Sequence, residues 1–143
     1  MSRREYPPRP IVGVGAIVVR EGKVLLVKRA AAPSRGLWAI PGGSLELGET
    51  LQRGAEREIL EETGIRIRAG APVYAFDFLE YDASNRLQYH FVVVDMEAEY
   101  VAGEVQAADD ALDARWVSPE ELPGMPVSGN TLKILKERGF ISS

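Results

Sequence analysis

Three acidic side chains are packed into five consecutive residues, where Glu58 is followed by Glu61 and Glu62. Because an α-helix has 3.6 residues per turn, spacings of three and four residues place these carboxylates on one face. Like charges so arranged destabilise a helix by roughly 0.2–0.5 kcal/mol per pair, and a bound cation removes that cost. Mg²⁺ prefers carboxylate and carbonyl oxygens and is commonly completed by substrate phosphates. The cluster therefore predicts a Mg²⁺ site for a phosphate ester or anhydride, with Mn²⁺ as a substitute; the alternative is a solvated helix face with salt bridges.

The sequence around the cluster favours the metal site. Gly43 and Ile65 bound a segment of 23 residues, GSLELGETLQRGAEREILEETGI. Its fixed positions are Gly43, Glu49, Arg57, Glu58, Glu61, Glu62 and Gly64. At average residue usage, seven such matches arise by chance on the order of 10⁻⁸ per starting position. The segment resembles an intact Nudix box, and the resemblance covers about Val12 to Leu122. The chain looks most like small MutT-like or ADP-ribose pyrophosphatase-like members of that family.

The resemblance implies a role for each polar residue of the box. Glu58 and Glu62 would be the primary metal ligands. Glu61 would share a second or third ion. The carbonyl of Gly42 would complete the site, although a turn glycine is the simpler interpretation. Glu49 and Arg57 would form a hydrogen-bonded pair that orients Glu58. An ordinary ion pair between Arg57 and the glutamate four residues later is compatible with that role.

The reaction implied by the resemblance is attack of metal-activated water on a phosphorus of a nucleoside diphosphate linked to another group, X. It needs no covalent protein nucleophile, and the chain has no cysteine. Catalytic contributions are expected from Glu61, from the orienting pair, and from a further acid in a loop after the box. Glu104 lies at about the expected place for this base, and Asp109 and Asp110 compete with it. The number of metal ions is left open.

The group X is less well defined, because specificity in this family comes from loops and strands outside the box. Arg29 matches the basic position expected to bind phosphate, although a salt bridge on the sheet surface is an alternative. Tyr81 resembles a tyrosine of the dinucleoside polyphosphate branch, although packing at a strand end also explains it. ADP-ribose or a related nucleotide sugar is the favoured substrate. Nucleoside triphosphates, dinucleoside polyphosphates, a noncatalytic nucleotide sensor and an enzyme acting on capped RNA are the alternatives.

Hydrophobic patterning predicts the elements that position these residues. A helix should begin at Thr50 as its N-cap and end before Gly64, with an apolar stripe toward the core. Strands are expected over 11–19, 23–29, 38–40, 73–81, 87–96 and 114–117. A helix start at Ser118 and a last helix that begins at position 128 or 130 follow them. These elements predict an α/β fold, and the resemblance implies a Nudix-type α/β/α sandwich with a central mixed β-sheet.

Length and composition fit one domain. The chain has 143 residues, of which 45% are hydrophobic, enough for one core. Residues 11–143 are expected to form a single Nudix domain after a loose arm over 1–10. No apolar run is long enough to span a membrane, and a cytoplasmic location is expected. The net charge of −4 argues against a nonspecific nucleic-acid binder, but not against a small phosphorylated substrate. No nucleic-acid partner is therefore expected, and the resemblance implies a small nucleotide substrate. The resemblance also allows a homodimer.

Overall fold

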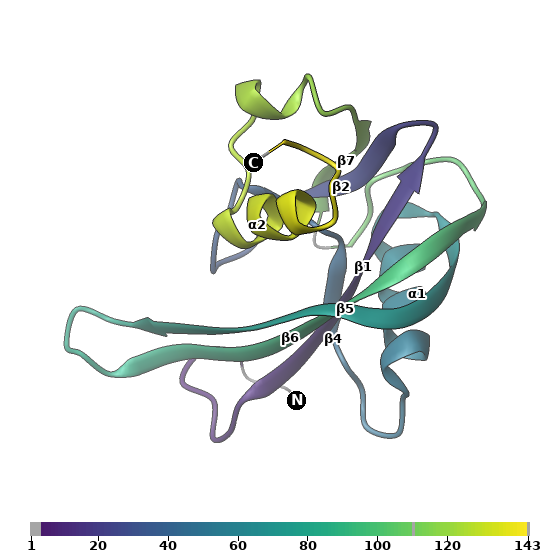
Figure 1. Cartoon of the computed structure of the whole chain (residues 1–143). Coiled ribbons are helices and arrows are strands. Elements are labelled where there is room, and N and C mark those ends of the chain that lie inside the picture. The colour runs from purple at the N-terminus through teal and green to yellow at the C-terminus, as the bar shows by residue number, and fades with distance from the viewer. Residues whose placement is uncertain (1–3, 110, 143) are drawn as a thin grey trace.

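The computed structural model describes residues 4–109 and 111–142. This part of the chain forms seven strands, two α-helices and a short 3₁₀ helix (Figure 1). In order they are β1 (Ile11–Arg20), β2 (Lys23–Arg29), β3 (Trp38–Ala39), β4 (Gly42–Ser44), α1 (Leu51–Thr63), β5 (Arg66–Tyr81), β6 (Leu87–Ala102), β7 (Ala111–Val117), the 3₁₀ helix (Leu122–Gly124) and α2 (Gly129–Glu137). Neither α-helix of these residues is long and apolar enough to cross a bilayer.

The strands form one mixed sheet with β1 at its centre. β1 runs parallel to β6 from Ile11, opposite Phe91, to Val18, opposite Ala98. The other strand pairs of the described residues are antiparallel. β4 pairs with positions 13–15 of β1, and β2 pairs with its last two residues. β1 therefore joins two parts of the sheet: β2, β3 and β7 on one side, and β4, β5 and β6 on the other. The chain passes from the first part to the second between β3 and β4. The predicted mixed sheet is confirmed.

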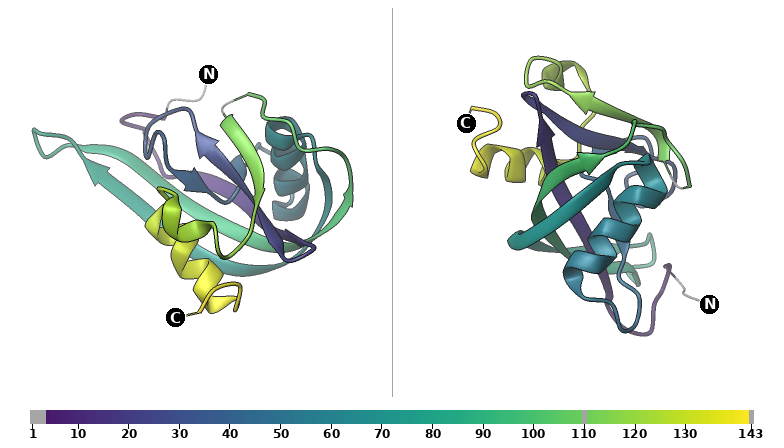
Figure 2. Two further views of the ribbon diagram at one scale, coloured as in Figure 1. Left: turned by 90° about the horizontal axis from the view of Figure 1, so that it is seen from above. Right: turned by 90° about the vertical axis from the view of Figure 1, so that its right-hand side faces the viewer.

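Alternation along β1 builds two cores on opposite faces of the sheet. Val14 and Ala16 pack in one cluster with Ile59 of α1. Ile17 points the other way and belongs to a second cluster, which also contains Ile134 of α2. Figure 2 shows α1 and α2 on opposite sides of β5 and β6. The predicted α/β/α sandwich is confirmed.

Both ends of α1 lie where the sequence predicts them. The Thr50 hydroxyl accepts a hydrogen bond from Arg53 N at 3.1 Å, which satisfies one of the free N–H groups of the first turn. Gly64 has a φ of 75°, and its N–H donates to Leu60 O at 3.0 Å. Glycine adopts this left-handed conformation without the steric cost of a Cβ. The polar residues of α1 therefore have a fixed position along the helix.

The β5–β6 hairpin is longer than predicted. The two strands cover 66–81 and 87–102, whereas the predicted strands cover 73–81 and 87–96. Register shifts on either side of Pro72 let the pairing continue past a residue that has no N–H to donate. β4 is absent from the predicted strands because two of its three residues are glycines, which have low strand propensity.

The segment after β7 also differs from the prediction. Ser118 does begin a capped turn, because its N–H donates to Glu121 Oε1 at 2.9 Å. The turn leads into the 3₁₀ helix, which contains Pro123, and no α-helix forms there. Proline has no N–H with which to continue an α-helical ladder. The predicted helix start at Ser118 is therefore wrong, and the last helix begins with Ser128 as its N-cap.

The described part of the predicted N-terminal arm contacts the β5–β6 hairpin. Tyr6 N donates to Gln88 O at 2.7 Å, and the Tyr6 hydroxyl donates to Asp82 Oδ2 at 2.6 Å. Glu5 accepts a hydrogen bond from Gln88 Nε2 at 2.9 Å. These contacts connect the arm to the turn between β5 and β6. Residues 1–3 lie outside the described residues, and the division into arm and domain at residue 11 stays a prediction.

Gly42→Ala is expected to destabilise the protein. A Cβ at Gly42 would collide with Val14 O and lie 2.7 Å from Gly15 Cα, and these backbone atoms have no rotamer that avoids it. Overpacking of this kind costs about 1–3 kcal/mol, so the urea unfolding midpoint should fall. Gly124→Ala is the matched control, because nothing lies within 4 Å of its Cβ position. Equal midpoints for the two variants would contradict the close β1–β4 contact.

Candidate metal and catalytic site

Arg57 lies at the centre of the acidic residues. Its Nε and Nη2 donate to the two carboxylate oxygens of Glu49 at 2.6 and 2.9 Å. Nη2 also donates to Ser44 O at 3.0 Å. Nη1 donates to Glu58 Oε1 at 2.8 Å and to Glu61 Oε2 at 3.3 Å. A guanidinium has five N–H donors, so every donor of Arg57 has a partner.

These contacts join the predicted orienting pair to two of the predicted ligands. The Arg57 and Glu49 side chains are 24% and 17% exposed, so the pair is partly shielded from solvent. Hydrogen bonds from Arg57 hold the pKa of the Glu49 carboxyl down to about 2, and hydrogen bonds from Glu49 raise the pKa of Arg57. Both groups are therefore charged at neutral pH. The ion pair between Arg57 and Glu61 coexists with the pair that reaches Glu58.

Gly42 and Gly43 lie directly against two carboxylates of α1. Gly42 N donates to Glu62 Oε1 at 2.9 Å, and Glu62 is only 8% exposed. A Cβ at Gly43 would collide with the Glu58 carboxylate. Glycines at both positions let the β4 backbone approach the carboxylates more closely than a larger residue permits. The structure thus brings Gly42, Glu58 and Glu62 together, and Arg57 connects Glu61 to them.

The donor atoms around Gly42 suit a hard divalent cation. Carboxylate and backbone carbonyl oxygens are the ligands that Mg²⁺ and Mn²⁺ take. In residues 4–109 and 111–142, no three acidic, histidine or cysteine side chains are grouped so that they could hold an ion. Glu58 is turned toward Arg57 and Glu62 toward Gly42 N. The residue types therefore fit the ion, and the carboxylates must rotate toward a common point when it binds.

The loop between β6 and β7 runs along the C-terminal end of α1. Two backbone hydrogen bonds connect it to the last turn of the helix, and in one of them Ala108 N donates to Glu62 O at 2.9 Å. Asp109 follows directly and is exposed. Glu104 is also exposed, and its carbonyl lies next to the glycine that ends α1. Asp110 lies outside the described residues. The loop therefore carries both described candidates for the general base, with Asp109 beside the turn that holds Glu62.

Arg29 and Tyr81 both lie at the ends of strands. Arg29 ends β2, and its Nε donates to Pro33 O at 2.8 Å, so its guanidinium holds the loop that follows the strand. Tyr81 is 54% exposed at the end of β5, opposite Leu87. On β6, Asp95 marks the level of the site, because it lies opposite Gly15, which pairs with Gly42. Leu87, the partner of Tyr81, lies eight residues before Asp95 on the same strand. At roughly 3.4 Å per residue that separation is about 27 Å. The structure does not bring Tyr81 to the carboxylates.

Asp95 is a buried acid outside the predicted site. It is 5% exposed on β6 and lies opposite Gly15, which in turn pairs with Gly42. A Cβ at Gly15 would be only 2.6 Å from Asp95 Oδ1. Burial raises the pKa of the Asp95 carboxyl to about 7. In the sequence, the one feature that could have identified Asp95 is its position as a single acid inside the apolar run 91–96. Asp95 therefore lies behind the β4 glycines, on the face of the sheet opposite α1.

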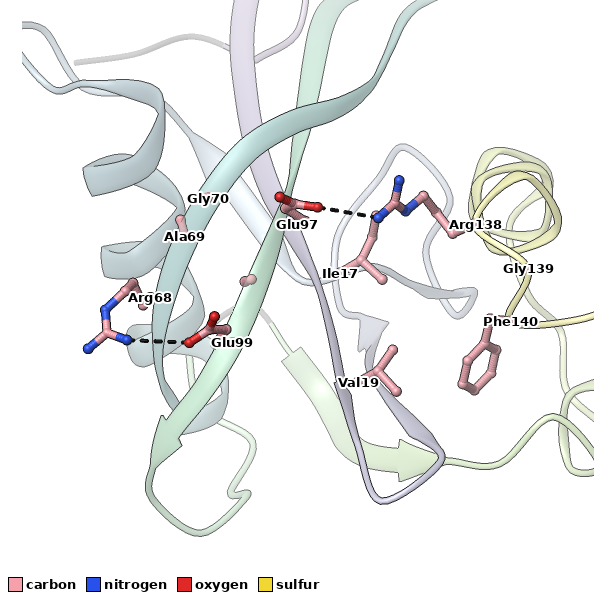
Figure 3. A pocket seen from close by; sticks show the side chains of 11 residues that line it. Ile17, Val19, Arg68, Ala69, Gly70, Glu97, Glu99, Arg138, Gly139 and Phe140 are labelled. Carbon is pink, nitrogen blue, oxygen red and sulfur yellow. Dashed lines mark hydrogen bonds and ion pairs between the residues drawn. The ribbon is translucent and has the colours of Figure 1, made fainter.

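A hollow of about 620 Å³ on this second face does not include the carboxylates of α1 (Figure 3). It lies between the sheet and the segment that follows α2. Arg68 donates to Glu99, and Arg138 donates to Glu97, both at 3.3 Å. Ile17 lines the same hollow, which places it opposite α1. The two arginines that border this hollow are therefore already neutralised.

Comparisons with known proteins show the family of this chain. The NUDIX domain family matches residues 9–135. The ADP-ribose pyrophosphatase of Methanocaldococcus jannaschii is 31% identical over 128 residues, which cover 90% of this chain and 72% of that protein. The NAD-capped RNA hydrolases NudC of Haemophilus influenzae are 31% identical over 137 residues, which cover 91% of this chain and 48% of each of those proteins. The chain thus spans about half the length of the NudC proteins.

Solved structures show the same fold. A MutT NUDIX hydrolase from Burkholderia pseudomallei is 32% identical, with a TM-score of 0.70 over 90% of this chain and 97% of that one. A bifunctional NMN adenylyltransferase/ADP ribose pyrophosphatase from Francisella tularensis, complexed with AMP and a Mn ion, is 30% identical, with a TM-score of 0.63 over 91% of this chain and 42% of that one. The fold and the arrangement of α1 therefore define a Nudix-type hydrolase. The chain belongs to the Nudix family and is a pyrophosphohydrolase of that family, whose enzymes generally use a divalent metal ion.

Asp95→Asn is expected to change how stability depends on pH. The folded-state pKa of about 7 lies above the ordinary value of 3.8, so between about pH 4 and pH 7 the unfolded chain releases a proton that the folded protein keeps. The parent should therefore lose stability relative to Asp95→Asn as pH rises through this window. At about 1.4 kcal/mol per pKa unit, the difference should reach roughly 4 kcal/mol above pH 7.

Urea unfolding of both proteins at several pH values measures this difference. Asp77→Asn, which removes an exposed acid of β5, is the matched control and should leave the pH profile unchanged. A constant difference between the parent and Asp95→Asn from pH 4 to pH 8 would show that Asp95 is already ionised at the low end of this range.

Proposed function

We propose that this chain is a Mg²⁺-dependent hydrolase that cleaves the pyrophosphate bond of a nucleoside diphosphate linked to X, with ADP-ribose or a related nucleotide sugar as the favoured substrate. The observation that carries the proposal is the Arg57 network, which holds Glu49, Glu58 and Glu61 around one guanidinium. Such a network fixes side chains that would otherwise repel one another beside the β4 glycines. The likeness to the Methanocaldococcus ADP-ribose pyrophosphatase supports the choice of substrate.

The chain's own residues would hold Mg²⁺, or Mn²⁺ as a substitute, through Glu58, Glu62 and the Gly42 carbonyl, with Glu61 available to a further ion. When bound, the metal supplies an activated water and neutralises charge on the phosphates. Arg57 orients Glu58 and offsets the repulsion within the carboxylate cluster. The Gly42 N–H donates to one oxygen of Glu62, which fixes this carboxylate beside the Gly42 backbone, where the cation would bind.

An acid of the loop between β6 and β7 would accept the proton of the attacking water. A general base must lie within hydrogen-bond reach of that proton, and the backbone bonds to the last turn of α1 keep this loop beside the ligands. Glu104 is the first candidate for the base and Asp109 the second. Arg29 stays a proposed phosphate ligand, because its planar fork suits a phosphate group. Tyr81 as a substrate contact, a homodimer and a cytoplasmic location stay predictions.

Other phosphoanhydrides are the second candidates. Nucleoside triphosphates and dinucleoside polyphosphates contain the same bond, and the likeness to the Burkholderia MutT hydrolase favours them. The likeness to NudC favours NAD-capped RNA, whereas the net charge of −4 disfavours a long polyanionic substrate. The carboxylates of α1 would act on the phosphoanhydride in every case. The substrate is therefore a question for the surfaces around them.

Purified protein with Mg²⁺ is expected to hydrolyse ADP-ribose to AMP and ribose phosphate. Glu58→Gln and Glu62→Gln each remove a charged ligand, so kcat/KM should fall by more than the roughly 10–100-fold that loss of an orienting partner costs. Glu56→Gln is the matched control in the same helix, because Glu56 accepts its hydrogen bond from Ala69 N instead. It should retain parental activity.

The assay compares ADP-ribose with dATP, diadenosine tetraphosphate and NAD-capped RNA, and chromatography resolves the products. Faster turnover of another member of this set would reassign the substrate and keep the chemistry. If no phosphoanhydride is cleaved, the proposed activity is wrong. If Glu58→Gln and Glu62→Gln both stay within a few-fold of the parent, the ligand assignment is wrong.

Glu104→Gln is expected to lower kcat by about 10²–10⁴-fold, the usual contribution of a general base. The substitution keeps the size of the side chain and removes its basic carboxylate, so KM should change little. Asp109→Asn serves as the comparison within the same loop. A large effect of Asp109→Asn together with parental activity of Glu104→Gln would transfer the base to Asp109.

A further inference from the structure

A second hollow, of about 410 Å³, lies on the flank of α1 where the helix passes the start of β5. Its lining residues are Glu49, Arg53, Glu56, Arg57, Leu60, Arg66 and Ile67. Two hydrogen bonds hold its walls together: Gln52 Nε2 donates to Gly70 O at 3.1 Å, and Ala69 N donates to Glu56 Oε2 at 3.0 Å. The hollow is therefore framed by a helix and a strand whose separation is fixed.

This hollow shares Glu49 and Arg57 with the carboxylate network, but its lining does not include the proposed metal ligands Glu58 and Glu62. Successive residues of a helix are turned by about 100°. Arg53, Glu56 and Leu60 therefore project from one side of α1, whereas Glu58 and Glu62 project from another. Leu60 and Ile67 supply the apolar part of its lining, and the other lining residues are charged.

The positive charge in the hollow exceeds the negative charge. Three arginines and two glutamates line it, in a chain whose net charge is −4. Arg57 offers nothing to a ligand, because each of its five donors already has an acceptor. The cationic groups that remain are Arg53 and Arg66.

The two carboxylates are also engaged elsewhere. Both oxygens of Glu49 accept from Arg57, and one of them also accepts from Glu46 N at 2.8 Å. One oxygen of Glu56 accepts from Ala69 N. Within residues 4–109 and 111–142, the side chains of Arg53 and Arg66 make no ion pair, although Glu56 lies three residues after Arg53 on α1 and Glu49 lies four residues before it, in the turn that leads into the helix.

The hollow on the other face of the sheet provides the contrast. Its two arginines, Arg68 and Arg138, each have a glutamate at 3.3 Å (Figure 3). An anion entering that hollow must displace a carboxylate from a guanidinium. An anion entering the α1 hollow displaces none from Arg53 or Arg66.

We propose that the α1 hollow binds the phosphate group of a phosphomonoester between Arg53 and Arg66. A planar guanidinium presents parallel N–H donors that match phosphate oxygens, and such charge-assisted bonds are about twice as strong as neutral ones. A volume of 410 Å³ leaves room for more than the phosphate alone, since small-molecule sites measure about 300–1,000 Å³. Orthophosphate is the smallest probe of this chemistry.

A metal-free titration with orthophosphate tests the proposal. In two-dimensional ¹H–¹⁵N NMR with a chelator present, the Nε–H signals of Arg53 and Arg66 and the amide of Ala69 should shift and reach saturation. Sodium chloride at equal ionic strength should not reproduce these shifts. Arg53→Gln and Arg66→Gln should each weaken the apparent affinity by about tenfold or more, the change expected from loss of one charge-assisted contact.

Arg68→Gln is the matched control, because Arg68 lies on the same strand as Arg66 but is paired with Glu99. It should keep the affinity within twofold of the parent. Far-ultraviolet circular dichroism checks that every variant is folded.

Shifts that grow linearly with ionic strength and do not saturate would overturn the proposal. So would shifts confined to Gly42 and Glu58, or equal affinities for the parent and the Arg53→Gln/Arg66→Gln double variant. Neither metal nor turnover enters this measurement, so its result is independent of the proposed hydrolase activity. Hydrolysis of ADP-ribose by Arg53→Gln in phosphate-free buffer should equal that of the parent.

Discussion

The guanidinium of Arg57 is the group on which the rest of the site depends. It joins β4 through Ser44 O, the turn before α1 through Glu49, and the helix itself through Glu58. Charge-assisted and bidentate hydrogen bonds are stronger than neutral ones and impose a geometry as well as an attraction. One cation therefore offsets the repulsion among neighbouring carboxylates and fixes α1 against the strand that approaches them. Without it, the acids of α1 would repel one another and turn toward solvent.

A second constraint is that two glycines, Gly15 and Gly42, lie between Asp95 of β6 and Glu62 of α1. Asp95 faces Gly15, Gly15 pairs with Gly42, and Gly42 N bonds Glu62. A Cβ at either glycine would meet backbone or carboxylate oxygen within 2.7 Å or less. The glycines thus transmit the position of β1 and β6 to a carboxylate on the other side of the sheet. The cost is a buried acid at one end of the line, since burial disfavours the charged form of the Asp95 carboxyl.

The parts of the structure that the sequence predicts are those set by local contacts. The cap at Thr50, the left-handed Gly64 and the ion pair between Arg57 and Glu61 depend on residues at most four positions apart, and all three are present. β4 could not be found this way. Its glycines form a strand only because β1 supplies the partner and α1 requires the close approach. The lengthening of β5 past Pro72 likewise depends on β6, whose register accepts the bulges.

The same distinction explains why the site residues differ in how well they could be predicted. Glu49, Arg57, Glu58 and Glu61 meet within one helix and the turn before it, so their spacing in the sequence nearly determines their spacing in the fold. Tyr81 has no such local reference. Its position follows from sixteen residues of β5 and their register with β6, and a strand rises about 3.4 Å per residue. Each residue of error in the predicted strand length or register therefore displaces the predicted position of Tyr81 by about 3.4 Å. The carboxylates that meet around Arg57 come from one helix and the turn before it, whereas Tyr81 depends on a long strand pairing, so the first could be predicted from the sequence and the second could not.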